Sequence, residues 1–142
     1  MSQENVEIVR GVFDAFRRRD NESIFRVYHP NIEWDMRRYS VWVEDQRVFH
    51  GHDGVKEFFR GWLQAFEDYV GEIHDFVDAG DKVVFTAVDR ARGKQSGVKV
   101  DRRHAQVWTM REGKVTRIQC FDDRAQALEA VGLSEQDAHQ AP

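Results

Sequence analysis

The segment Val98–Asp123, VKVDRRHAQVWTMREGKVTRIQCFDD, decides the fold because it has the pattern of two strands joined by a tight turn. Glu112-Gly113 lies between two alternating stretches, and glycine at such a position is a strong signal for a two-residue hairpin turn. A loop of only these two residues would fix the register of the hairpin. The expected cross-strand pairs are Arg111 with Lys114, Trp108 with Arg117, Gln106 with Gln119, His104 with Phe121 and Arg102 with Asp123.

Side chains alternate along a strand, so this register divides the hairpin into two unlike faces. The polar face would carry Arg102, His104, Gln106, Trp108, Arg117, Gln119 and Asp123, and the apolar face Ala105, Val107, Thr109, Ile118 and Cys120. We expect His104, Gln106 and Trp108 to point into a cavity, because Trp108 would be poorly hydrated on an open face. Ala105, Val107 and Ile118 would then face away. The reverse arrangement, with the apolar face packed under helices, stays open.

The composition limits the class of protein. The chain has 142 residues and a mass of 16.7 kDa, which predicts one domain, and ten Phe with four Trp predict an aromatic core. The net charge of −4 without a basic block argues against a nucleic-acid binder. One cysteine, Cys120, excludes an intramolecular disulfide and a cysteine zinc cage. Neither a signal peptide nor a membrane span is recognisable, so we expect a soluble cytoplasmic domain with no membrane partner.

Helices and strands can be placed along the rest of the chain. Apolar residues recur at helical spacing from Gln3 to Arg19 and from Asp53, the expected cap, to about Glu67. A short helix capped by Asp20 or Asn21 should end before His29-Pro30. Alternating patterns predict strands at 32–36, 69–77 and 82–92, and 124–131 should be a helical turn. The segment 37–50 is expected to be an irregular flap or a short strand.

This order predicts an α+β domain with helices on one face of a bent antiparallel sheet. Five short motifs then resemble the SnoaL-like branch of the nuclear-transport-factor-2-like superfamily, which includes polyketide cyclases and ketosteroid isomerases. They are VFDAF at 12–16, HPNIEW at 29–34, GHDGV at 51–55, REGKV at 111–115 and DRAQAL at 123–128. The resemblance implies a cone-shaped, cystatin-like fold that encloses a cavity, with the domain at 1–133 and a frayed polar tail at 134–142. It also implies a homodimer through the outer face of the sheet.

Three residues are candidates for acid/base chemistry. Asp35 falls where the similar isomerases place their proton-shuttling carboxylate, and His104 has an ordinary pKa close to neutral pH. Asp123 falls where the similar SnoaL-like cyclases place an acid/base group. Each has a structural alternative: Asp35 on a polar strand face, His104 stacked on Phe121 or at a dimer contact, and Asp123 paired with Arg102. The isomerases' oxyanion donors correspond to Val12 and Gln106, which puts steroid chemistry in doubt.

Together these features predict a cofactor-independent acid/base enzyme of the cyclase, isomerase or dehydratase type. Its ligand would be a small apolar, oxygenated compound held in the cone cavity. The expected ligand-binding residues are Trp34, Phe59, Trp62, Gln106, Trp108 and Gln119. The isolated histidines lack metal-ligand spacing, so no metal is expected. The alternatives are a non-catalytic binding or dimerisation module of the same fold, and an epoxide hydrolase variant that uses Arg102 and Asp123.

Overall fold

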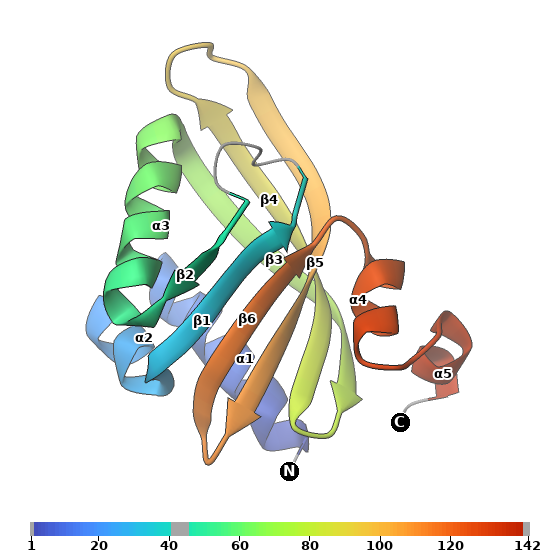
Figure 1. The fold of residues 1–142 in the computed structure, drawn as a ribbon. Helices are drawn as coiled ribbons and strands as arrows, with labels where there is room; N and C mark the ends of the chain where they lie inside the picture. The colour runs from blue at the N-terminus through green and yellow to red at the C-terminus, as the bar shows by residue number, and fades with distance from the viewer. Residues whose placement is uncertain (1, 41–45, 141–142) are drawn as a thin grey trace.

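A curved sheet of six strands organises the molecule, as the ribbon in Figure 1 shows. The computed structural model describes residues 2–40 and 46–140. From one edge of the sheet to the other, the strands are β2 (Val48–His50), β1 (Tyr28–Arg38), β6 (Lys114–Phe121), β5 (Lys99–Arg111), β4 (Lys82–Gly93) and β3 (Phe66–Ala79). All neighbours are antiparallel except β1 and β6, which run parallel. The expected α+β class is confirmed, but the sheet is mixed.

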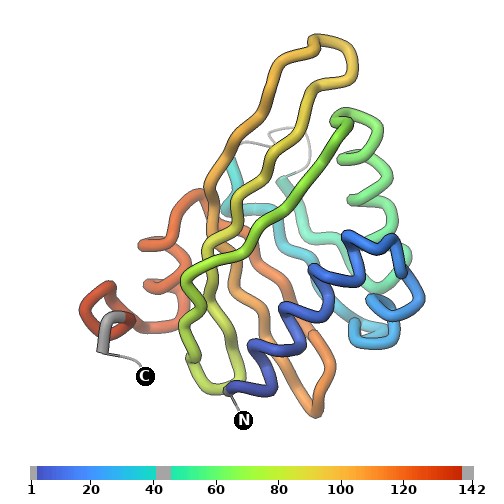
Figure 2. The backbone as a smooth tube through the Cα atoms, turned by 180° about the vertical axis from the view of Figure 1, so that it is seen from behind, coloured from blue at the N-terminus to red at the C-terminus, as the bar shows by residue number. Residues whose placement is uncertain are grey.

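Helices cover both faces of this sheet unequally. The helices α1 (Ser2–Arg17), α2 (Asn21–Val27) and α3 (Gly51–Ala65) lie on the concave face, where α1 crosses the strands in Figure 2. The main core lies under them and includes Trp34, Phe58 and Trp108. On the other face, α4 (Arg124–Ala130) buries a second, smaller apolar cluster. In the described part of the chain, no helix is long and apolar enough to span a membrane.

The helix starts differ in how their first amide groups are satisfied. Asp20 caps α2, as one of the two expected residues, by accepting a hydrogen bond from the Ser23 amide at 3.2 Å. Asp53 does not cap α3, because that helix begins two residues earlier and Asp53 lies in its first turn. Gly54 packs there against Phe49: a Cβ at this position would lie 3.1 Å from the Phe49 carbonyl carbon. The first turn of α3 therefore packs directly against β2.

The central hairpin has the expected turn but not the expected register. Glu112 and Gly113 both have positive φ, as a two-residue hairpin turn that follows strand twist requires, and Arg111 pairs with Lys114. A β-bulge follows at once, because Met110 pairs with Val115 whereas Thr109 pairs with Arg117. The extra residue shifts all later pairs by one position. The observed pairs include Trp108 with Ile118, Gln106 with Cys120 and Ala105 with Phe121.

This bulge exchanges the two faces of β6 while it leaves β5 unchanged. Ile118 and Cys120 belong to the main core, and the expectation that Ile118 faces away is therefore wrong. Arg117 and Gln119, predicted on the same face as Trp108, lie on the opposite face because they pair with Thr109 and Val107. Ala105 and Val107 do face away, and α4 buries them.

The remaining predicted segments lie near the expected positions. The flap at 37–50 contains β2 at its end, and its residues 41–45 are outside the described part of the chain. Gly132 follows α4 with positive φ, as expected for a helix C-terminus. The segment predicted as a frayed tail contains a short helix, α5 (Glu135–Gln140).

Candidate functional site

A cavity of about 720 Å³ lies between the concave face of the sheet and the helices. Its wall is largely aromatic and includes Phe13, Trp34, Phe59 and Trp62. Where the lining reaches solvent it has charged groups of both signs and two exposed apolar side chains. These are Arg17, Arg19, Glu67, Asp68, Lys94, Leu63 and Val70. The cavity is therefore apolar inside and mixed in charge at its opening.

Three polar side chains of β5 form a hydrogen-bonded row on the cavity wall. The Trp108 indole N–H donates to Gln106 Oε1 at 2.8 Å, and Gln106 Nε2 lies 3.0 Å from His104 Nε2. Since an indole N–H can only donate, it fixes the orientation of the Gln106 amide. The amide then donates to His104 Nε2, so the proton of the neutral imidazole is on Nδ1. His104, Gln106 and Trp108 line the cavity as expected, and each is at most 6% exposed.

A buried carboxylate lies beside this row on the neighbouring strand. Asp89 is on β4, where its neighbour Ala87 pairs with His104, and its Oδ2 lies 3.4 Å from His104 Nδ1. The two atoms are close enough for an ion pair, but the contact does not have the geometry of a hydrogen bond. Nδ1 has no hydrogen-bond partner among the described residues. Tyr69 on β3 donates its hydroxyl to Asp89 Oδ1 at 2.8 Å. Both Asp89 and Tyr69 line the cavity.

Burial shifts the pKa values of Asp89 and His104 in the directions that favour their neutral forms. Desolvation raises the pKa of Asp89, and the attraction of His104 and the hydrogen bond from Tyr69 offset only part of that shift. Desolvation also lowers the pKa of His104, against the opposing effect of Asp89. A carboxyl group with a raised pKa next to a neutral imidazole is an arrangement suited to general acid/base chemistry near neutral pH.

The lowered pKa of His104 predicts a pH dependence of stability. The unfolded chain takes up this proton near pH 6.5 and the folded chain only at lower pH, so stability should fall as the pH falls below about 6.5. The raised pKa of Asp89 acts in the opposite direction, with stability decreasing as the pH rises from about 3.8. Urea unfolding between about pH 7.5 and 5.5 should therefore show a steeper loss of stability on acidification for the wild type than for His104→Asn. Equal slopes for the two proteins would contradict the burial of a neutral His104.

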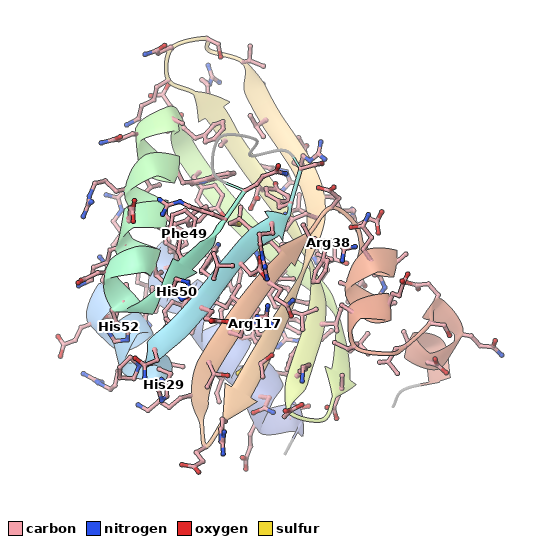
Figure 3. The ribbon with its side chains drawn as sticks, viewed as in Figure 1. His29, Arg38, Phe49, His50, His52 and Arg117 are labelled. Atoms are coloured by element: carbon pink, nitrogen blue, oxygen red, sulfur yellow. The ribbon has the colours of Figure 1, made fainter. Side chains whose placement is uncertain are left out.

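Asp35 lies on the outer side of the sheet and not in the cavity. Its Oδ2 accepts from Arg37 Nη2 at 2.8 Å and from Arg117 Nη2 at 3.0 Å, and its Oδ1 accepts from the Arg37 amide. Figure 3 labels Arg117 on β6 and His50 on β2 in this region, and His50 lies 3.8 Å from Glu33. Burial acts to raise the pKa of Asp35, but the two guanidinium groups outweigh it and hold the pKa below its usual value. This carboxylate is ionised and fully paired.

The other two predicted polar residues also lie outside the cavity lining. Asp123 is the N-cap of α4 and accepts from the Gln126 amide at 2.9 Å. The expected ion pair between Asp123 and Arg102 is not among those of the described residues, since Arg102 lies across from Asp89 on β4. Gln119 points to the outer face as a consequence of the bulge in β6. Trp34, Phe59 and Trp62 line the cavity as expected.

Sequence reasoning missed Asp89 and Tyr69, although one signal was available. Val83, Phe85, Ala87 and Asp89 alternate along β4, and the first three belong to the main core. A carboxylate that continues an apolar face is unusual, and its register with His104 makes the two diagonal neighbours across the strands.

No group of three or more His, Cys, Asp or Glu side chains that could hold a metal ion occurs within residues 2–40 and 46–140.

Comparisons with known proteins agree with this architecture. A structure of TerC co-crystallised with polyporic acid is 27% identical, with a TM-score of 0.71, and covers 90% of this chain and 98% of that chain. A Burkholderia pseudomallei protein of unknown function, described as NTF2-like, is 23% identical with a TM-score of 0.72, over 93% of this chain and 99% of that one. A Catenulispora acidiphila protein with a ketosteroid isomerase-like fold, in complex with trimethylamine, is 17% identical with a TM-score of 0.69, over 96% and 98%. The last two relationships concern the fold alone.

No match was found among curated proteins. The family model described as the SnoaL-like domain matches residues 9–118, which is most of the chain. These residues include α2, α3 and five complete strands of the sheet, together with the wall that carries Asp89 and His104. The chain therefore belongs to the SnoaL-like domain family.

Proposed function

We propose that this protein is a cofactor-independent acid/base enzyme that acts on a small apolar, oxygenated compound in the cavity. The observation that carries the proposal is the buried pair of Asp89 and His104 on the cavity wall, 3.4 Å apart. Paired titratable groups whose environments shift their pKa values are a recurrent feature of catalytic sites. The expected reaction class is cyclisation, isomerisation or dehydration.

The lining of the cavity supports a ligand of this kind. Aromatic side chains from α1, α3 and β1 provide a largely apolar wall, and a volume of about 720 Å³ is in the range of small-molecule sites. The relatives crystallised with polyporic acid and with trimethylamine hold small organic molecules. We propose Trp34, Phe59, Trp62, Gln106 and Trp108 as the ligand-binding residues of this chain.

Asp89 is the proposed proton-transfer group. In the first step, its carboxylate would take a proton from a carbon next to a carbonyl group of the ligand, which gives an enolate and a neutral Asp89. Return of the proton to another carbon completes an isomerisation. In a dehydration, the enolate expels a hydroxyl group, which takes the proton from Asp89 and leaves as water. In a ring closure, the enolate carbon attacks a second carbonyl carbon of the ligand, and the alkoxide that forms takes the proton from Asp89. The raised pKa of Asp89 favours proton uptake at neutral pH.

His104 is the proposed positioning residue for this carboxylate. Its Nδ1 proton faces Asp89 because Nε2 accepts from Gln106, and Trp108 holds the Gln106 amide in the required orientation. The hydrogen bonds of the row therefore keep the proton of the neutral His104 on Nδ1, and no contact with solvent is needed for this. Tyr69 restrains the other carboxylate oxygen. The roles predicted for Asp35 and Asp123 from the resemblance, and for Gln119 from the pattern of the hairpin, stay predictions.

The alternative function is a non-catalytic binding module with the same cavity. One observation favours it: the polar groups of Trp108, Gln106 and His104 are hydrogen-bonded to one another, as in a static wall. Exchange of carbon-bound protons distinguishes the two functions without knowledge of the natural substrate. The expected homodimer and cytoplasmic location also stay predictions.

The test uses β-tetralone, a bicyclic ketone with acidic protons next to its carbonyl group. We expect the protein to accelerate the loss of these proton signals in heavy water, followed by nuclear magnetic resonance, over buffer of the same pH. The rate should rise with pH through the pKa of Asp89, because only the carboxylate form can accept a proton. Binding of β-tetralone without any acceleration would favour the non-catalytic module.

A further inference from the structure

A second cavity, which the proposed reaction does not use, lies between α2 and α3. Its volume is about 220 Å³, which is below the usual range for a complete small-molecule ligand but enough for part of one. Its wall is mostly apolar and includes Ile24 and Phe25 from α2 and Val55 from α3. The ring of Phe25 contacts that of His52 at 5.0 Å, where α2 lies beside the first turn of α3 in Figure 1. We call this cavity the side pocket.

The charged groups in the wall of the side pocket are all positive. Lys56 and Arg60 lie one turn apart on α3, and both residues are exposed. Neither forms an ion pair with a described residue, and no carboxylate of the described chain lines the pocket. The acid between them in the sequence, Glu57, is paired with Arg47 instead. Since like charges at this spacing on a helix repel each other, an anion bound between Lys56 and Arg60 would relieve that repulsion.

The side pocket adjoins the main cavity. The residues that line both are Phe16, Asn21, Tyr28, Phe59 and Leu63. The rings of Phe16 and Phe59, 5.4 Å apart, lie between the two interiors, whereas Asn21 and Leu63 are exposed, so the two spaces meet towards solvent. A ligand in the main cavity can therefore extend past Leu63 into the side pocket. Its reacting part then remains near Asp89, which lines only the main cavity.

We propose that the side pocket is a second subsite, which binds an apolar chain or ring of the ligand that ends in a carboxylate group. The carboxylate would accept hydrogen bonds from the Lys56 ammonium and Arg60 guanidinium groups, which are stronger than hydrogen bonds between neutral groups. This inference rests on the proposed function for the other end of the ligand, whose carbonyl group would lie near Asp89. It narrows the substrate class to apolar keto acids in which a ring or a short chain separates the carbonyl group from the carboxylate.

The test compares two ligands that differ in one group, 4-phenylbutyrate and its neutral amide, 4-phenylbutanamide. Calorimetric titration at low salt should show that the wild type binds the acid more tightly than the amide by about fivefold or more, the range for two partly exposed ion pairs. Lys56→Gln combined with Arg60→Gln should make the two affinities equal. On addition of the acid, the backbone amide signals of Ile24 and Phe25 should shift in nuclear magnetic resonance spectra, since these residues line only the side pocket.

Arg17→Gln combined with Lys94→Gln is the matched control, because it removes two positive charges from the opening of the main cavity. This variant should keep the preference for the acid. Equal affinities of acid and amide in the wild type would overturn the subsite, as would loss of the preference in the control or signal shifts confined to the main cavity. Asp89→Asn separates this outcome from the proposed function: it should lose proton exchange in β-tetralone and keep the preference for the acid, since binding involves no proton transfer.

Discussion

Trp108→Ala is expected to lower the free energy of unfolding by about 3–5 kcal/mol, the range for a large aromatic residue truncated in a core. The side chain is 1% exposed and contacts rings from three other elements. Its partners are Phe13 on α1, Tyr28 on β1 and Phe85 on β4. The truncation also leaves the Gln106 carbonyl without its indole donor. Urea unfolding at neutral pH measures this loss directly.

Trp108→Phe and Val98→Ala provide the comparison for this prediction. The phenylalanine keeps most of the apolar volume and loses the indole N–H, so it should cost less than the alanine variant. Val98 is 61% exposed, and its truncation should change stability by no more than about 0.5 kcal/mol. A loss of only about 1 kcal/mol in Trp108→Ala would mean that the packing of this residue between helix α1 and the sheet contributes little to stability.

Asp89→Asn is expected to reduce proton exchange in β-tetralone by about 100-fold or more, because the amide cannot accept the proton. The same change should leave thermal stability unchanged or higher at neutral pH. Burial penalises the ionised carboxyl group, and asparagine removes that charge while it keeps an oxygen for the Tyr69 hydroxyl. Loss of activity without loss of stability would distinguish a catalytic carboxylate from a structural one. Equal exchange rates in wild type and variant would exclude Asp89 as the base.

Asp35→Asn and Asp123→Asn make the same chemical change outside the cavity. Asparagine is as good an N-cap as aspartate, so Asp123→Asn should leave both folding and exchange close to the wild type. Asp35→Asn removes the partner of two guanidinium groups and should lower stability rather than the exchange rate of the folded protein. If either variant lost exchange as Asp89→Asn does, the role predicted for that residue from the family resemblance would gain support.

The sequence predicted the architecture well because its periodic patterns are long. The helical stripe that contains Phe58 and Trp62, and the alternation through His104, Gln106 and Trp108, each fix one face of an element. The placement of Trp34, Phe59 and Trp62 around a cavity followed from such patterns together with the resemblance. The parallel pairing of β1 with β6 could not be predicted, because no local pattern records which distant strand becomes a neighbour.

The details of the site depend on features with almost no sequence signal. One additional residue after Val115 rotates Arg117, Gln119 and Cys120 to the faces opposite those predicted. Bulges are set by the fit between strands and not by residue type, so the error could not be avoided from alternation alone. Asp89 could have been recognised, since it continues an apolar face, but its partner Tyr69 lies on a strand that itself has irregular register. The site is therefore less predictable than the fold.

The position of β6 in the sheet has a consequence for how the chain acquires its structure during synthesis. β6 lies between β1 and β5, so it provides the hydrogen-bonded connection between the β1–β2 part of the sheet and the β3–β4–β5 part. It is also the last strand to be synthesised, more than 80 residues after β1 begins. Pairings over such separations are slow to form, and domains emerge from the ribosome N-terminal end first. The aromatic faces of α1, α3 and β1 will remain without their central strand until almost the whole domain has left the ribosome, which makes this interval the most exposed to misassembly.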